Sequence, residues 1–402
     1  MLLFVLYSLN EIFQSIRSYY KKPNVHNYND KNNKPTPLGT KTEYFHKYSS
    51  LTNHYMKKLI TGYMHSKPEL ANQKWCATEK IHGGNFAWLI YLDENYNIKI
   101  DYCKRSGVIP EGDKTFTHDK IVEKYKNRII TLAVRLMDDE RFEAKTVQIF
   151  GEIFGGWYLG ETADGHKHLN KKIAYNDKVD FAGFDIRVTG DKFNGYLNKL
   201  DTFVLFDLYR IYRVKVLATG TFDELYKNLN PIFKSDVFRD FNMPINEKLY
   251  NEKDIYINPY IAEGIVLTPI NTTYINGHRV AIKWKNKKFT ENDSNYVPKP
   301  KNNSDNDKYS YHVKTLGQYI NNNRFDAVKS KLSEKQLKNK MAVVGLIVSD
   351  AIDDLKNNYE EMDICPSEVL TFLKFENKDI KKIKALACTE YATKIYDWIN
   401  QC

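Results

Sequence analysis

A lysine that ends a strand-like segment and is followed almost at once by two glycines constrains this chain more than any other feature. Lys80 lies in the stretch 78–86, with Gly83 and Gly84 after it and an apolar strand pattern over residues 86–92. A lysine amine that has lost its proton attacks phosphorus when a nucleotide is held in line. Glycines lack Cβ and let the backbone approach a phosphate closely. The stretch predicts such a nucleophile, although a surface lysine before a turn is the commoner source of this match.

Three further residues stand beside strand-like runs. Arg105 stands before a glycine turn at Gly107 and can grip a phosphate with two N–H groups, unless it is a surface arginine. Glu152 follows the apolar strand 147–150 between glycines, a context that suits a sugar hydroxyl or a metal-bound water but also an ordinary turn glutamate. Phe184 lies in an alternating strand pattern, and it stacks on a base or fills the core with about equal expectation.

The last part of this region adds a carboxylate and two lysines. Glu263 stands before a glycine and an apolar strand, which repeats the arrangement at Glu152. Lys283 and Lys285 are two residues apart in the strand-like segment 279–285, so they share one face. Two like charges aimed together are costly unless an anion lies between them. This segment therefore indicates an anion-binding strand.

The net charge and the cysteine content favour some classes of protein and argue against others. The 402 residues carry 60 Lys and Arg against 50 Asp and Glu, a net charge of +10, with a pI of about 9.0. A basic chain favours polyanionic partners, although an A/T-rich genome enriches lysine by codon usage alone. The five cysteines form no Cys-x-x-Cys pair, so neither a zinc ribbon nor a disulfide framework is indicated. We expect a reducing intracellular, cytoplasmic location.

The N-terminal part differs from the rest. Residues 1–16 place apolar side chains on one helical face, and residues 18–43 are polar without apolar periodicity. We therefore predict an N-terminal extension over residues 1–43, made of an amphipathic helix and a linker. The apolar run is too short to span a bilayer and lacks the features of a secretory signal, so no membrane partner is expected.

Helical spacing dominates the C-terminal part. The polar, proline-bearing segment 292–308 is typical of a hinge or linker. Before it, in the N-terminal half of the chain, an amphipathic helix is predicted over residues 118–138. The C-terminal part lacks the short strands and turn signals of an OB-fold. Beyond the hinge, helices are predicted over residues 316–332, 337–355, 367–375 and 379–399.

These motifs, taken in order, resemble those of the covalent nucleotidyltransferases, and most closely those of the RNA ligase 2 family, which includes phage enzymes and trypanosome RNA-editing ligases. The resemblance covers about residues 45–402 and leaves out residues 1–44. Gly84 and Trp284 depart from the family pattern beside its key side chains. The segments that carry the resemblance are 47–55, 79–86, 104–105, 150–152, 184–185, 262–264 and 279–283.

The resemblance implies an α+β fold: an ATP-grasp-like nucleotidyltransferase domain with antiparallel sheets over residues 44–295, a linker over 296–308 and an all-α domain over 309–402. It also implies ATP-dependent ligation through lysyl-AMP and an RNA adenylate. The implied catalytic residues are Lys80, Lys283, Lys285 and Glu263. Contacts with ATP are implied for Glu79, Ile81, His82, Asn85, Arg105, Glu152, Phe184, Asp185, Glu263, Lys283 and Lys285.

The family also implies a metal and a substrate. Mg²⁺, with Mn²⁺ able to substitute, would be held by Glu152, Asp185 and Glu263, in part through water. RNA contacts are implied for Arg105, Arg324 and Asp350. The expected substrate is a nicked RNA duplex with 3′-OH and 5′-phosphate ends, acted on by a monomer of viral, phage or other origin. A DNA ligase, a capping-type nucleotidyltransferase and a catalytically inactive RNA-binding relative are the alternatives.

Overall fold

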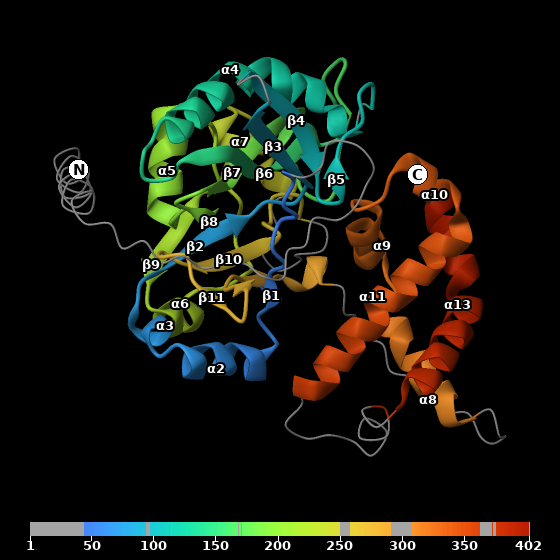
Figure 1. The fold of residues 1–402 in the computed structure, drawn as a ribbon. Coiled ribbons are helices and arrows are strands. Elements are labelled where there is room, and N and C mark those ends of the chain that lie inside the picture. Colours follow the sequence, from blue (N-terminus) through green and yellow to red (C-terminus); the bar gives the residue numbers. More distant parts are fainter. Residues whose placement is uncertain are drawn as a thin grey trace.

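The computed structural model contains a two-sheet domain over residues 44–290 and a helical module over residues 307–401, set side by side (Figure 1). The predicted fold class is confirmed, because antiparallel strands with helices form the first part and helices form the second. The predictions for residues 1–43, and for nearly all of the linker at 296–308, lie outside the described residues. The structure describes residues 44–401 except 94–96, 114, 168, 170, 250–257, 291–306, 362–371 and 373–374.

The first sheet has six antiparallel strands in the order β5-β4-β3-β6-β7-β8. Successive side chains of a strand point to opposite faces. Phe86 and Trp88 therefore join the core beneath helix α4 (His118–Met137), whereas Ala87 faces a second cluster that contains Tyr48. The strands are β3 (Gly84–Leu92), β4 (Ile98–Lys104), β5 (Gly107–Val108), β6 (Ala144–Trp157), β7 (Asn176–Gly190) and β8 (Asn194–Tyr196).

The second sheet has the order β1-β13-β10-β2-β9, and its pairs are antiparallel except for β1 with β13. One face lies over the helices α2, α3 and α6 (Figure 1). Trp284 points to that side and stacks on Tyr226, with ring centroids 4.7 Å apart. The strands are β1 (Thr52–Asn53), β2 (Trp75–Lys80), β9 (Val216–Gly220), β10 (Gly264–Pro269) and β13 (Ile282–Lys285).

The helices of the two-sheet domain are amphipathic and cover the sheets. The helix predicted over residues 118–138 is confirmed as α4, and all four side chains predicted to face inward, Ile121, Tyr125, Leu132 and Leu136, are buried. A small hairpin of β11 (Tyr274–Ile275) and β12 (His278–Arg279) carries Arg279 into the core. The other helices are α2 (Lys57–Ser66), α3 (Glu69–Asn72), α5 (Lys199–Leu208), α6 (Phe222–Asn228) and α7 (Val237–Asp240).

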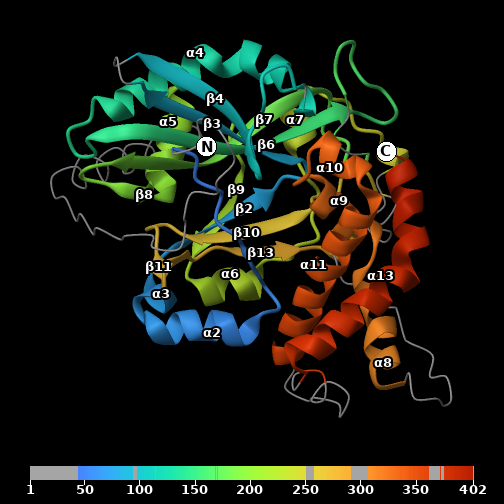
Figure 2. The same ribbon diagram turned by 45° about the vertical axis from the view of Figure 1, so that its right-hand side comes forward.

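The helical module packs around one apolar cluster of its own. The predicted helix over 316–332 is wrong, because the Asn321 side chain accepts the N–H of Arg324 at 3.0 Å and starts a new helix there. In the two views α9 lies toward the sheets (Figure 1, Figure 2). The helices here are α8 (Asp307–Leu316), η4 (Gly317–Tyr319), α9 (Asn322–Lys329), α10 (Glu334–Lys338), α11 (Lys340–Glu361) and α13 (Asn377–Asn400).

The helix predicted over 337–355 is confirmed as α11 from Lys340 onward, but residues 337–339 lie outside that helix. A capping box between Ser333 and Gln336 starts α10, and Asn339 then interrupts the chain and accepts the N–H of Ala342 at 3.2 Å. Most of the helix predicted over 367–375 falls on residues outside the described part. No helix in the described part of the chain is both long and apolar enough to cross a membrane.

Candidate active site

Three neighbouring strands of the second sheet end at one point. Gly264, the first residue of β10, pairs with Lys80 on one side and with Lys285 on the other. A Cβ on Gly264 would lie 2.2 Å from the carbonyl oxygen of Trp284, and its φ of +151° is one that other residues rarely adopt. The glycine thus lets β13 approach closely, and the ladder brings the two lysines to either side of Glu263.

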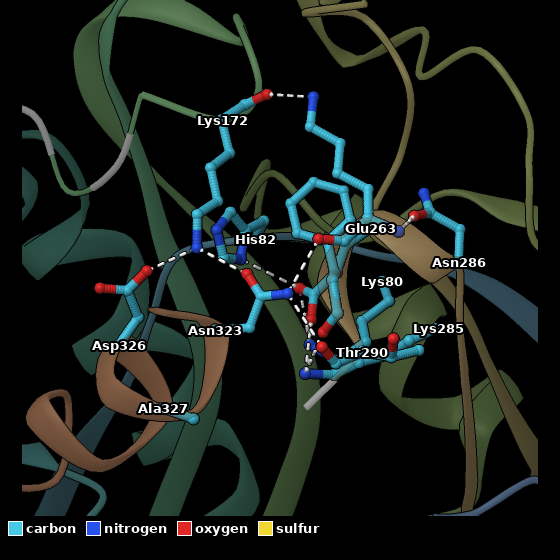
Figure 3. A network of polar contacts seen from close by, with 12 residues as sticks. Lys80, His82, Lys172, Glu263, Lys285, Asn286, Thr290, Asn323, Asp326 and Ala327 are labelled. Atoms are coloured by element: carbon cyan, nitrogen blue, oxygen red, sulfur yellow. Dashed lines mark hydrogen bonds and ion pairs between the residues drawn. The ribbon is translucent and has the colours of Figure 1, made fainter. Parts of the chain in front are cut away.

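The Glu263 carboxylate is the centre of a charged cluster (Figure 3). Its Oε2 lies 2.8 Å from Nζ of Lys80 and 3.3 Å from Nδ1 of His82, and its Oε1 lies 3.2 Å from Nζ of Lys285. Burial favours the neutral acid, but the two ammonium groups and the imidazole outweigh it and hold the pKa of Glu263 well below its usual range. The cluster therefore keeps an ionised carboxylate against the candidate nucleophile.

His82 is held from two sides. Its ring packs on Phe289, with centroids 4.8 Å apart, and its backbone N–H donates to the Tyr175 hydroxyl at 3.0 Å. Burial lowers the pKa of His82, although Glu263 opposes that shift. The imidazole is consequently neutral near pH 7 and can donate through Nδ1 to the carboxylate.

Glu152 faces this cluster from the first sheet. It pairs with Asn85 across β6 and β3. Desolvation raises the pKa of Glu152 to about 7; Lys80 opposes the shift and Glu263 adds to it. A Cβ on Gly83 would lie 2.0 Å from the carbonyl oxygen of Ile153, so a glycine is required for the lysine turn to sit against β6. Glu152 has no ion-pair partner within 4.0 Å in the described part of the chain.

A cavity of about 820 Å³ opens between the two sheets and the helical module. Phe184 borders it beside Tyr48, with ring centroids 5.0 Å apart, so the aromatic face expected to stack on a base is half-buried at the cavity wall. The predicted site residues that line the cavity are Glu79, Lys80, Ile81, His82, Asn85, Arg105, Glu152, Phe184, Glu263, Lys283, Lys285, Arg324 and Asp350.

Asp185 is the exception, and its geometry speaks against the expected contact with metal or sugar. Its carboxylate is fully buried and accepts two hydrogen bonds from Arg279, both 2.7 Å, one from Lys199 at 2.8 Å and one from the Tyr48 hydroxyl at 2.6 Å. Burial favours the neutral acid, yet Arg279 and Lys199 hold the pKa of Asp185 below its usual range. Asp185 thus ties β7 to the N-terminal segment behind Phe184, away from the cavity lining.

Arg324 and Asp350 also have a different immediate role from a direct RNA contact. The Arg324 side chain is 1% exposed and forms ion pairs with Asp350 and, at 2.6 Å, with Asp354. Its Nε donates to the Tyr319 carbonyl oxygen at 2.5 Å. The guanidinium is therefore engaged within the module, at the wall of the cavity.

No pattern in the sequence predicts the contacts that join the module to the two-sheet domain. Lys172 donates to Asn323 at 2.9 Å and to Asp326 at 2.5 Å (Figure 3). The Asn323 amide donates to the carbonyl oxygens of Lys288 and Thr290, both at 2.9 Å. Lys172 and Thr290 lie outside regular helices and strands, and the partners are far apart in the chain, so only the tertiary structure reveals that α9 is fastened beside the Lys80 cluster.

Another contact that the sequence could not reveal involves Glu79. Its side chain is buried and accepts the Ser235 hydroxyl at 2.6 Å. Burial raises the pKa of Glu79 to about 7, with the Ser235 hydrogen bond opposing the shift.

Within the described part of the chain, no three His, Cys, Asp or Glu side chains gather closely enough to hold a metal ion by themselves.

Comparison with known families decides the assignment of this site. A family model described as RNA ligase matches residues 73–285, more than half of the chain, and one described as T4 RNA ligase 2 C-terminal matches residues 303–386. The chain belongs to the RNA ligase family. The first match ends at Lys285, so the lysine turn, both glutamates and the lysine strand of this family member all fall inside it.

Individual relatives match shorter stretches. RNA-editing ligase 2, mitochondrial, of Trypanosoma brucei brucei is 35% identical over 85 residues, which are 21% of this chain and 20% of that protein. RNA-editing ligase 1, mitochondrial, from the same organism is 24% identical over 186 residues, 39% of this chain and 38% of that protein. The chain thus matches two fifths or less of the length of these relatives.

Among solved structures, an RNA ligase of Naegleria gruberi with pyrophosphate is similar, with a TM-score of 0.38 and 15% identity over 66% of this chain and 61% of that one. A mutant of the same enzyme with ATP and Mn has a TM-score of 0.39 and 15% identity over 66% of this chain and 62% of that one.

Proposed function

We propose that this protein is an ATP-dependent RNA ligase that seals 3′-OH/5′-phosphate nicks in duplex RNA through lysyl-AMP and RNA-adenylate intermediates. The observation that carries the proposal is the convergence of Lys80, Glu263 and the strand of Lys283 and Lys285 at one cavity wall. A lysine held by a carboxylate beside other lysines, at the wall of a nucleotide-sized cavity, suits attack on a phosphorus.

The first step follows from the residues around Lys80. Its nitrogen forms a bond to the α-phosphorus of ATP while the bond from that phosphorus to the pyrophosphate oxygen breaks, and the nitrogen gives up its protons to water. Lys283 and Lys285 would stabilise the charge that develops on the α-phosphate. Glu263 lies 2.8 Å from Nζ of Lys80 and orients that amine. The neutral His82, whose Nδ1 lies 3.3 Å from Glu263, would help to hold that carboxylate against the amine.

The nucleoside half of ATP would lie deeper in the cavity. Phe184 offers an aromatic face for adenine, and Ile81 provides apolar contact beside it. Glu152 could accept a ribose hydroxyl when ionised. Asp185 would not contact the nucleotide. Its hydrogen bonds with Arg279 in the core would hold β7 so that Phe184 keeps its orientation.

A divalent metal fits one side of this site. Glu152 is the carboxylate best suited to hold hydrated Mg²⁺, or Mn²⁺ in its place, because it has a pKa of about 7 and no ion-pair partner within 4.0 Å in the described part of the chain. When bound, the metal would neutralise phosphate charge. Glu263 would serve it less directly, since both of its oxygens already hold cations.

The later steps use the same phosphorus chemistry on RNA. The 5′-phosphate at a nick displaces Lys80 from AMP, and the 3′-hydroxyl then attacks that 5′-phosphate and releases AMP. The proposed preference for duplex RNA rests on the helical module, whose Lys329 and Lys331 line the cavity and could contact RNA phosphates. We take the active species to be a monomer.

The test is incubation with α-labelled ATP and Mg²⁺, followed by nicked RNA and nicked DNA duplexes in parallel. Wild-type protein should become labelled and should seal the RNA nick faster. Lys80→Ala should abolish the label, whereas Lys99→Ala, at an exposed lysine of β4, should not. Label that persists on Lys80→Ala would move the nucleophile elsewhere, and preferred sealing of DNA would support a DNA ligase instead.

A further inference from the structure

The cavity extends well beyond the Lys80 cluster. Its lining includes the connection between α9 and α10, where Lys331 lies, and on the opposite side Ser50 and Arg105 of the two-sheet domain. Arg105 is half-buried and donates to the Ser50 hydroxyl at 3.4 Å. This part of the cavity is therefore walled by both domains, and it is continuous with the part that holds Lys80.

Arg105 and Lys331, which come from different domains, both line this part of the cavity, and their charges also act on the amine of Lys47. Desolvation lowers the pKa of the Lys47 amine, and the charges of Arg105 and Lys331 lower it further. Neither Lys47 nor Arg105 has a carboxylate within 4.0 Å among the residues that the structure describes. Like charges that converge in this way raise the energy of the protein unless an anion lies between them. Their placement beside the ligation chemistry points to a phosphate as that anion.

The position of the Lys331 side chain is fixed by an ion pair with Asp350. One oxygen of Asp350 forms an ion pair with the buried Arg324, and the other lies 3.6 Å from Nζ of Lys331. Arg324 is in turn fixed by Asp354, at 2.6 Å, and by the Tyr319 carbonyl oxygen. Lys331 is itself about two fifths exposed, with 40% of its side-chain surface accessible, so it can both touch Asp350 and reach a ligand.

We propose that Lys331, held by Asp350 and facing the side of the cavity that carries Arg105, grips the 5′-phosphate of the RNA strand at the nick. Arg324 and Asp350 then position Lys331 and do not touch the RNA. The assignment rests on the proposed ligase function and adds to it a residue of the helical module that recognises the end to be joined. It also gives a physical reason for placing the module against the nucleotide cavity.

The test compares Lys331→Ala with Lys338→Ala, an exposed lysine of the same module that does not line the cavity. Three rates or affinities are measured at fixed salt: lysyl-AMP formation without RNA, transfer of AMP to the nick, and binding of nicked duplexes with a 5′-phosphate or a 5′-hydroxyl. A charge-assisted contact corresponds to roughly a 10- to 100-fold effect. Lys331→Ala should therefore lose about that much in transfer relative to its own rate of lysyl-AMP formation.

The binding measurement identifies the phosphate. Wild-type protein should prefer the 5′-phosphate nick, Lys331→Ala should lose that preference, and Lys331→Arg should keep it. Asp350→Asn should behave like Lys331→Ala, because it removes one of the charges that aim the lysine. Equal weakening for both nicks, as for a backbone phosphate, would overturn the assignment, and so would equal effects of Lys331→Ala and Lys338→Ala. Failure of the wild-type protein to become labelled by ATP would instead refute the ligase function.

Discussion

Replacing Asp185 with asparagine removes the charge from a fully buried polar centre of the two-sheet domain. The carboxylate is 0% exposed and receives four donors, two of them from Arg279 and one each from Lys199 and Tyr48. The asparagine side chain has the same shape but keeps only one acceptor oxygen. Its NH₂ group would face the N–H and O–H donors that the second carboxylate oxygen now accepts. Two buried cations then lose their counter-ion.

The magnitude follows from that loss. Removing one partner of a buried ion pair typically costs about 3–5 kcal/mol, which for a domain of this size corresponds to a fall in Tm of roughly 10 °C. Burial favours the neutral acid, but Arg279 and Lys199 outweigh it and depress the pKa of Asp185. The stabilisation is therefore complete above the usual carboxyl pKa and is lost only as the pH falls below it toward the lower folded pKa. The difference between wild type and Asp185→Asn should be constant between pH 6 and 8.

Urea unfolding followed by tryptophan fluorescence measures this difference. Asp207→Asn is the matched control, since Asp207 also pairs with an arginine, Arg213, but its side chain is 59% exposed. The control should change the unfolding midpoint little. A loss below about 1 kcal/mol for Asp185→Asn, together with a large loss of Mg²⁺ affinity, would refute the structural role and restore Asp185 as a metal ligand.

Three further predictions concern the site. Because burial raises the pKa of Glu79 to about 7, the folded protein retains a proton between pH 4.5 and 7 that the unfolded chain loses, so stability falls as the pH rises through that window. Glu79→Gln should therefore stabilise the protein by up to about 3 kcal/mol at pH 8 and little at pH 4.5 in urea unfolding; equal effects at both pH values would contradict this. Lys285→Ala should slow lysyl-AMP formation roughly 100- to 1000-fold in single-turnover labelling while far-UV circular dichroism stays unchanged, and near-normal labelling would mean that Lys285 does not face the phosphate. Gly83→Ala should reduce stability, seen as a lower Tm, because its Cβ would clash with Ile153; an unchanged Tm would show that the turn can move.

The residues of the candidate site were predictable because their chemistry is carried by local patterns. Lys80 stands before glycines at a strand end, and Lys283 and Lys285 alternate with Trp284, whose ring packs on the opposite face. Alternation with a period of two and residues at strand ends can both be recognised in a sequence without knowledge of the fold. Helix boundaries in the module were predicted less well, because the caps at Asn321 and Ser333 divide runs whose apolar spacing looks continuous.

The amino-acid sequence by itself predicted the candidate nucleophile, the glutamates and the order of the motifs, since each depends on residue type and spacing, and the family resemblance predicted the α+β class. Only the tertiary structure decided that Asp185 faces the core, that Arg324 and Asp350 support Lys331, and that Lys172 fastens the module to the two-sheet domain. These roles depend on contacts between side chains that are far apart in the sequence. Lys172 and Asp326, for example, are more than a hundred residues apart. Whether a charged residue binds a ligand or another residue is set by the partner that folding places beside it, and that partner is not encoded in its neighbours along the chain.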